Sequence, residues 1–321
     1  MESLLTPLTT FKDQFNFNPS ILHEEHLGHF DSVVITGMGG SAICVSLLKM
    51  LFPELSVTLH NSYGLPINYN KDTTLLIINS YSGNTEEALD SFDRGLKIGA
   101  PMALLSRGGE LIQKGKDVGA PYIILPESNL EPRFSIGHQL IGLLTLMGET
   151  EKITTLKQKI ELVSIDTAKS EGEALAQSFI GKYPIIYTSS QFYPVAYLIK
   201  AAINEGAKIP SFINQIPEAN HNELQSFITD EATNEHERFA FLFITSPFEH
   251  QRIAKRFSVM KDLYEKRGFV VIHKSKDSTN ITEVFNSILS GYYAATYLAI
   301  AKNIDPYKTP FIQEFKKIMA Q

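Results

Sequence analysis

Residues 33–49 read VVITGMGGSAICVSLLK, and residues 74–87 read TLLIINSYSGNTEE. In both stretches an apolar run typical of a buried strand ends in glycine and serine and passes directly into a helical pattern. Repeated strand–loop–helix units predict a parallel sheet with helices on both faces. The two loops should then lie at the carboxyl edge of that sheet, where ligands bind in open α/β folds.

The same alternation extends through most of the chain and predicts an α/β fold. In the first half we expect strands at 33–36, 57–60, 74–79, 102–106 and 122–125. The helices between and after them are expected at 42–52, 85–99, 110–119 and 134–148. In the second half we expect strands at 184–189, 239–246 and 269–273, and helices at 191–205, 249–267 and 281–302. Strand-initiated units thus occur twice, which favours two similar domains, each with a mostly parallel sheet flanked by helices.

The length of 321 residues also favours two domains. We expect an N-terminal domain over residues 1–150 with a leading helix, and a C-terminal domain over residues 181–321. Between them, residues 151–180 are polar and rich in Lys and Glu, with apolar residues at helical spacing. This spacing predicts a connecting helical segment.

Charge and composition exclude several classes of protein. The chain has 29 Lys and Arg against 35 Asp and Glu, a formal net charge of −6, so it lacks the basic footprint of a nucleic-acid-binding protein. The single cysteine, Cys44, excludes an intrachain disulfide framework, and we expect this thiol in the core. No histidine spacing predicts a metal site. The first ten residues hold no Lys or Arg, and no apolar stretch approaches the roughly 20 residues that span a bilayer. We expect a cytoplasmic protein that binds no membrane.

The glycine loop after the first strand has two other interpretations. Gly37-x-Gly39-x-x-Ala42 satisfies the dinucleotide pattern, but that fold needs a carboxylate at the end of the second strand. Here that strand ends in His60-Asn61. A tight strand-to-helix turn without a ligand is the remaining alternative.

The serine loop gives the sharper signal. Ser80, Ser82 and Thr85 place three hydroxyl groups around a glycine at a helix start. Hydroxyls, backbone N–H groups and the positive end of a helix dipole together suit a phosphate. Alternatively, Asn84 and Glu87 form an ordinary helix cap and the serines are merely solvated. We favour phosphate binding because two such loops occur on consecutive crossover units of one sheet.

These loops resemble those of the sugar isomerase (SIS) family, which binds phosphosugars. Within it the chain is most similar to the bifunctional phosphoglucose/phosphomannose isomerase group, which has two SIS domains. The resemblance extends to Glu131-Pro132-Arg133, to NEGAKIPSFINQIPEANHNELQSF at 204–227 and to YYAATYLAIAKNIDPYKTP at 292–310. It therefore covers most of the chain.

The resemblance implies reversible isomerisation of glucose 6-phosphate and mannose 6-phosphate to fructose 6-phosphate through an enediolate, without cofactor or metal. It assigns the base to Glu205, ring opening to His221, and enediolate stabilisation to Arg133. A lysine should assist ring opening, and we choose Lys302 over Lys308. The implied substrate-binding side chains are Ser41, Ser80, Ser82 and Thr85, with loop backbone from Gly39, Gly40 and Gly83. Each residue also has an ordinary structural interpretation, as a solvated surface group, a loop hydrogen-bonding group or a helix cap.

Other functions remain open beside this one. A non-catalytic regulator that binds phosphosugars could have the same fold. Sensors that control transcription need a basic DNA-binding segment, and residues 1–30 contain only Lys12 as a fixed cation. An aminosugar-phosphate enzyme would need an additional domain or a different acid/base set. The resemblance also implies a homodimer in which His221 reaches the pocket of the partner subunit.

Overall fold

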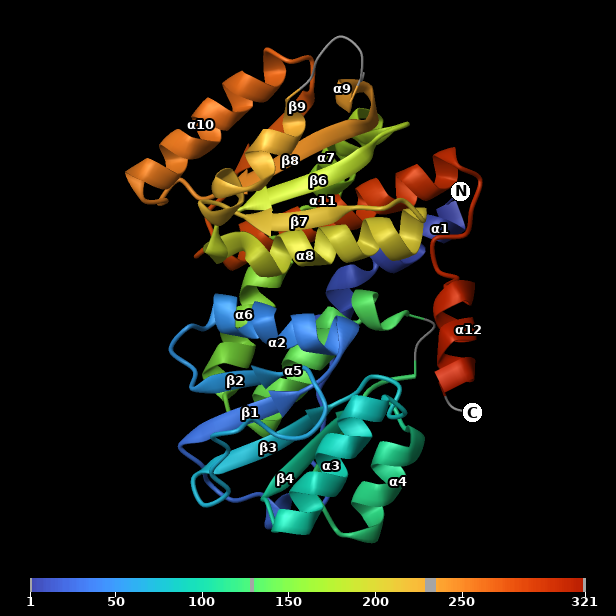
Figure 1. The fold of residues 1–321 in the computed structure, drawn as a ribbon. Helices are drawn as coiled ribbons and strands as arrows, with labels where there is room; N and C mark the ends of the chain where they lie inside the picture. The colour runs from blue at the N-terminus through green and yellow to red at the C-terminus, as the bar shows by residue number, and fades with distance from the viewer. Residues whose placement is uncertain (1, 128–129, 229–234, 320–321) are drawn as a thin grey trace. The chain divides into compact units, whose positions relative to one another are not determined.

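The computed structural model describes residues 2–127, 130–228 and 235–319. The chain divides into two compact units (Figure 1). The N unit consists of Thr10–Glu161, and the C unit consists of Met1–Thr9 together with Leu162–Gln321. Each unit is described by itself below.

The N unit is a five-stranded parallel sheet in the order β2-β1-β3-β4-β5. Its strands are β1 Ser32–Thr36, β2 Val57–His60, β3 Thr74–Asn79, β4 Met102–Ser106 and β5 Tyr122–Ile124. Its α-helices are α2 Gly39–Leu51, α3 Glu86–Ile98, α4 Gly109–Asp117, α5 Ile136–Leu146 and α6 Thr150–Glu161. Short 3-10 turns are η1 Phe11–Asn16, η2 Glu24–His26 and η3 Pro132–Phe134.

Burial explains why the central strands form. All six residues of β3 are buried, as expected for a strand covered on both faces. Strand β3 pairs with β1 from Ser32↔Thr74 to Thr36↔Ile78, so the two strands end level with each other. The loops that follow them therefore meet at one edge of the sheet, as the sequence predicts.

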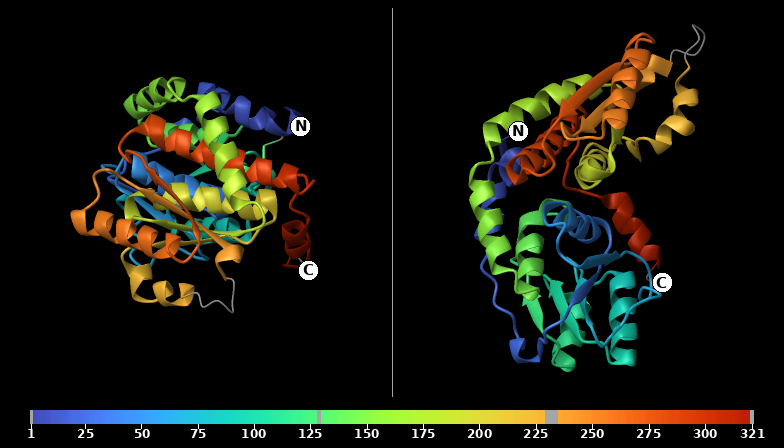
Figure 2. Two further views of the ribbon diagram at one scale, coloured as in Figure 1. Left: turned by 90° about the horizontal axis from the view of Figure 1, so that it is seen from above. Right: turned by 90° about the vertical axis from the view of Figure 1, so that its left-hand side faces the viewer.

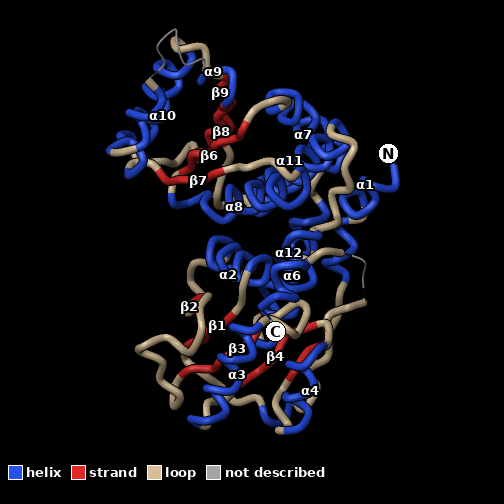
Figure 3. Tube along the Cα trace, turned by 45° about the vertical axis from the view of Figure 1, so that its right-hand side comes forward, coloured by secondary structure: helices blue, strands red, loops and turns tan. Residues whose placement is uncertain are grey.

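The C unit contains a four-stranded parallel sheet in the order β7-β6-β8-β9. Along the chain, its strands alternate with helices (Figure 3). Its strands are β6 Tyr183–Thr188, β7 Phe212–Gln215, β8 Phe239–Thr245 and β9 Val270–Ser275. Its α-helices are α1 Glu2–Thr9, α7 Ile165–Phe179, α8 Tyr193–Ala202, α9 Glu235–Arg238, α10 Gln251–Glu265, α11 Ile281–Ala301 and α12 Pro310–Met319. Shorter helical turns are η4 Ser190–Phe192, η5 Ile203–Ala207, η6 Glu218–His221 and η7 Glu223–Phe227.

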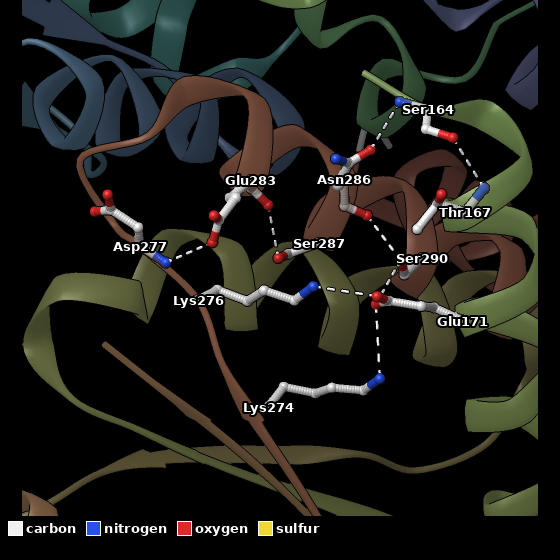
Figure 4. A network of polar contacts seen from close by, with 10 residues as sticks. All are labelled: Ser164, Thr167, Glu171, Lys274, Lys276, Asp277, Glu283, Asn286, Ser287 and Ser290. Atoms are coloured by element: carbon white, nitrogen blue, oxygen red, sulfur yellow. Dashed lines mark hydrogen bonds and ion pairs between the residues drawn. The ribbon is translucent and has the colours of Figure 1, made fainter. Parts of the chain in front are cut away.

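Helices α7 and α11 lie side by side (Figure 2), and glycine permits their close approach. A Cβ atom added at Gly172 would come within 2.4 Å of the Tyr293 Cβ. Polar contacts also join these helices to the end of β9 (Figure 4). Glu171 lies 3.1 Å from the Lys276 ammonium and 3.6 Å from that of Lys274, so one carboxylate ties α7 to the sheet.

The two parallel sheets confirm the predicted fold class, but the structure adds elements that the sequence pattern did not indicate. Strand β7 and helix α12 were not expected. The first nine residues group with the C unit, where the Tyr307 hydroxyl donates a hydrogen bond to the Leu4 carbonyl. The expected division instead placed these residues with the N-terminal domain. Within the described ranges, no helix is both long and apolar enough to cross a membrane.

Candidate active site

In the N unit, the glycine and serine loops are joined by hydrogen bonds at the carboxyl edge of the sheet. The Tyr81 backbone N–H donates to Ser41 Oγ at 3.2 Å. The side-chain amide of Asn79, the last residue of β3, donates to the Ser41 carbonyl at 3.1 Å. Ser41 therefore lies against the loop that begins at Ser80.

The hydroxyl groups of the serine loop are held near one another. Ser80 Oγ donates to Thr85 Oγ1 at 3.0 Å, and Ser82 Oγ accepts from the Asn84 N–H at 3.3 Å. Ser80 is almost fully buried, whereas Ser82 and Thr85 are half-buried. The structure thus brings Ser41, Ser80, Ser82 and Thr85 together, as predicted.

Two glycines allow the backbone of these loops to pass close to neighbouring chain. Gly83 has φ +73°, and a Cβ there would lie 1.8 Å from the Gly108 carbonyl oxygen. A Cβ at Gly40 would lie 2.9 Å from the Pro132 carbonyl carbon. Gly83 is locked further because its carbonyl accepts from the Leu111 N–H at 2.9 Å. The third predicted loop glycine, Gly39, has φ +51° at the start of α2.

The start of helix α3 has no side-chain cap. Its N-cap residue is Thr85, whose side chain makes no capping hydrogen bond. The alternative in which Asn84 caps this helix is wrong, because the Asn84 Oδ1 accepts from the Glu110 N–H at 2.9 Å, at the start of α4. The first-turn N–H groups of α3 can therefore receive an external anion.

Arg133 lies in the N unit, in the turn η3. It is 3% exposed, with its guanidinium 4.8 Å from the Phe134 ring centroid and 3.7 Å from the Glu131 carboxylate. The backbone at Pro132-Arg133 is what Gly40 approaches so closely. Arg133 is thus positioned beside the glycine loop.

Glu205 lies in the C unit, in a π-helical turn. Helix α8 continues into η5 at Ile203–Ala207, and this turn contains Glu205. The sequence predicts a regular helix up to that residue; the structure instead widens the last turn. Single π turns inside α-helices are frequent at functional sites. Glu205 is half-buried there.

Two lysines bind the carbonyl groups at the end of this turn. Lys302 Nζ donates to the carbonyls of Ala207 and Lys208, both at 3.1 Å. Lys208 has φ +54°, and its Nζ donates to the carbonyls of Glu205, Gly206 and Asp305. The structure thus places Lys302 beside the Glu205 turn, with its ammonium acting on backbone oxygens.

Lys308, the lysine that competes with Lys302 for the predicted role, has a different environment. Its Nζ lies 3.5 Å from the Asp305 carboxylate, and its side chain is 79% exposed. Of these two candidates, Lys302 is the one whose ammonium is hydrogen-bonded to the turn that contains Glu205.

His221 lies in the turn η6, which follows strand β7 of the C-unit sheet, whereas Glu205 lies in the turn η5, which precedes that strand. Helix α8 and strand β7 are consecutive and lie alongside each other, so Glu205 precedes the start of β7 and His221 follows its end (Figure 1). The four residues of β7 span about 13 Å. His221 is exposed, and within the described residues its ring makes no hydrogen bond. Within one C unit, the whole length of β7 therefore lies between the turn that contains Glu205 and the turn that contains His221.

Sequence reasoning missed two groups that organise the loops. Asn79 is fully buried and connects β3 to Ser41, and Asn84 anchors α4. The motif contains both residues, but the partner of each lies more than twenty residues away. Nothing local in the sequence indicates that partner.

The structure tests the expectations about thiols and metals for the residues that it describes. Cys44 is fully buried, and burial raises the pKa of its thiol, so it is a core residue as predicted. Over residues 2–127, 130–228 and 235–319, no group of His, Cys, Asp and Glu side chains could hold a metal ion.

Comparison with known proteins adds independent information. Residues 168–319 match the family model described as the bacterial phospho-glucose isomerase C-terminal SIS domain. The chain is 32% identical to a bifunctional phosphoglucose/phosphomannose isomerase of Thermoplasma volcanium, over 98% of both chains. It is 30% identical to a D-glucosamine-6-phosphate 4-epimerase of Sulfolobus acidocaldarius, over 65% of this chain and 66% of the epimerase. Among solved structures, a hypothetical protein of Thermus thermophilus superposes with a TM-score of 0.69 at 14% identity, over 99% of this chain and 88% of the other.

Proposed function

This chain belongs to the bifunctional phosphoglucose/phosphomannose isomerase family, and we propose from its site how it performs that family's reaction. It is an intramolecular oxidoreductase that interconverts glucose 6-phosphate or mannose 6-phosphate with fructose 6-phosphate. The reaction moves a proton between C2 and C1 through an enediolate. We place the enzyme in the cytoplasm, which fits its single buried, unpaired cysteine.

The observation that carries the binding proposal is the uncapped start of α3 behind a hydroxyl-rich loop. Ser82 and Thr85 supply hydroxyl donors, and Ser80 joins them once its hydroxyl turns from Thr85 Oγ1 to the phosphate. The first turn of α3 supplies N–H groups and a positive dipole end. Together these groups can stabilise a bound phosphate without a fixed cation. Ser41 binds at the same edge, with Gly39, Gly40 and Gly83 allowing close backbone approach.

Proton transfer is assigned to the C unit. Glu205 takes the proton from C2 and returns it to C1, because a carboxylate is a suitable base for a carbon acid next to a carbonyl. Its backbone carbonyl accepts from Lys208, and Lys302 holds the end of the same turn through the Ala207 carbonyl. Lys302 assists ring opening. For this its ammonium must give up its hydrogen bond to the Ala207 or Lys208 carbonyl and donate to the sugar instead. Arg133 provides the positive charge that stabilises the enediolate.

His221 opens the sugar ring in the site of the partner subunit of a homodimer. The support for this assignment is its position at the opposite end of β7 from Glu205. A symmetric dimer gives two equivalent composite sites, each with Glu205 from one chain and His221 from the other.

Isotope exchange tests the proposed chemistry directly. Purified enzyme should wash deuterium from C2 of both glucose 6-phosphate and mannose 6-phosphate into water as fructose 6-phosphate forms. A phosphosugar sensor without activity would bind these compounds and leave the deuterium in place. The epimerase relative suggests a second control: glucosamine 6-phosphate should yield no 4-epimer. If the enzyme forms the 4-epimer and does not exchange the C2 deuterium, it is an epimerase and the proposed isomerase reaction is wrong.

A further inference from the structure

The N unit has a pocket at the opposite edge of its sheet from the serine loop. The pocket has a volume of about 420 Å³, within the range of small-molecule sites. It is lined by the start of β1 and β3, by Thr58 of β2 and by residues 66–69. It therefore lies entirely within one compact unit and apart from the proposed phosphate site.

The connection between β2 and β3 creates this pocket. The other connections between consecutive strands of the N unit contain the helices α2, α3 and α4, whereas residues 61–73 form no helix (Figure 1). An irregular segment covers the sheet less completely than a helix. The pocket lies beneath it.

Hydrogen bonds hold this segment in place, so the pocket is preformed. The Gly64 N–H donates to the Asp90 carboxylate at 2.6 Å, and Ser91 Oγ donates to the Gly64 carbonyl at 2.8 Å. Further along, the Tyr69 hydroxyl donates to the Thr74 carbonyl at 3.0 Å. Leu65 and Tyr69 also pack against the hydrophobic core.

The lining contains no charged side chain. Its polar groups are the hydroxyls of Ser32, Thr58, Tyr69 and Thr74 and the amide of Asn68. Ser32 and Thr74 share a hydrogen bond of 2.8 Å on the strands, while Thr58 and Asn68 are exposed at the rim. The lining also contains no residue of a helix start, so a phosphate or carboxylate would lose hydration there without gaining a counter-charge or the N–H groups that the serine loop offers.

We propose that this pocket binds an uncharged polyol, such as a sugar without a phosphate. Hydroxyl and amide groups both donate and accept, as sugar hydroxyls require. The apolar lining from Val33, Val34 and Pro66 suits the C–H face of a sugar ring, and the Ile67 side chain is fully exposed at the rim. The ligand is thus distinct from the substrate in charge as well as in place.

Methyl α-glucoside is a suitable probe, because its ring cannot open and it carries no phosphate. With the Ile, Val and Ala methyl groups isotopically labelled in the full chain, its titration should shift the NMR signals of Ile67 and Val33. The signal of Ala42, beside the glycine loop, should stay in place. Inorganic phosphate should do the reverse. Phosphate that shifts Ile67 as strongly as the glucoside, or a glucoside that shifts neither pocket signal, overturns the proposal.

Two exposed substitutions then test the pocket without disturbing the core. Thr58→Val combined with Asn68→Ala removes both rim polar groups and should weaken glucoside binding about tenfold. The matched control, Asn61→Ala combined with Thr73→Val, alters the same segment outside the pocket and should bind as wild type. Equal binding by both variants would show that the glucoside binds elsewhere. Isomerase activity should be unchanged in both.

Discussion

The carboxyl edges of the two sheets are alike in topology and different in chemistry. Strand orders β2-β1-β3-β4 and β7-β6-β8-β9 correspond, so the loop after β8 is the counterpart of the serine loop after β3. In the C unit the Ser246 N–H donates to the Glu249 carboxylate at 3.2 Å, and Ser246 Oγ accepts from the Phe248 N–H. The next helix, α10, is capped by the His250 side chain.

This difference teaches that duplicating the fold does not duplicate the binding site. In the loop after β8, backbone N–H groups donate to side chains of the same loop. The Glu249 carboxylate is bound there, where a bound phosphate would lie in the serine loop. The loop after β3 leaves a helix start uncapped. We therefore expect the serine loop of the N unit to control substrate affinity and Glu205 of the C unit to control turnover.

The largest expected effect is on turnover, from a change in the C unit. Glu205→Gln preserves the shape of the side chain but removes the proton acceptor. We expect kcat to fall by about 10²–10⁴, with KM nearly unchanged. Steady-state kinetics and C2 deuterium washout measure this. Wild-type washout by the variant would assign the base to another residue.

Subunit mixing tests whether the C unit acts across a dimer. Glu205→Gln and His221→Ala chains should each be inactive alone. After exchange, each heterodimer should have one intact site and about half the activity of a wild-type dimer. If mass spectrometry shows that heterodimers have formed and activity does not return, Glu205 and His221 of one chain act in the same active site.

A smaller effect is expected on affinity, from a change in the N unit. Ser82→Ala combined with Thr85→Ala removes two hydroxyl donors to a charged group, each worth about 1.5–3 kcal/mol. KM should rise at least about tenfold, with kcat changed less. The matched control is Ser246→Ala in the corresponding loop of the C unit, which should leave KM unchanged. A similar rise in both proteins would contradict the division between the units.

The smallest expected effect is on the free energy of unfolding, from a change at Glu171. This residue has no proposed part in catalysis, so the change tests folding of the C unit alone. Burial alone would raise the pKa of Glu171, but the hydrogen bond and charge of Lys276, with Lys274 and Ser290, lower it overall (Figure 4). A lowered pKa stabilises the fold above the unfolded value of about 4.3, and this stabilisation is lost as pH falls through the folded pKa.

Glu171→Gln should therefore lower the free energy of unfolding by about 1 kcal/mol at pH 7. The difference from wild type should shrink toward zero in acid. Urea unfolding at several pH values measures it. A difference that stays constant with pH would mean that the carboxylate charge is not responsible.

The sequence predicted the sheets and the N-unit loops well because their signals are local. Strand β3 is an uninterrupted apolar run, and glycine with serine marks the turn that follows it. Strand β7 was missed because it is four residues long and none of them is buried, so neither run length nor alternation indicates it. Helix α12 has no buried residue, and its pattern lies after the last expected unit.

Other features depend on partners that are distant in sequence. The π turn at Glu205 and the lysine contacts to it involve Asp305 and Lys302, about a hundred residues away. The grouping of α1 with the C unit likewise depends on Tyr307. The separation of His221 from Glu205 by the length of β7 follows only once β7 itself is known.

The close approach of Gly83 to Gly108 has a consequence for the thermodynamics of binding. The serine loop cannot rearrange, since its backbone lies against the β4–α4 turn and shares hydrogen bonds with it. Most of the conformational entropy of this loop is therefore lost during folding, not when substrate arrives. Inorganic phosphate alone should then bind with little ordering of the chain, and calorimetry should record a small heat-capacity change for that step.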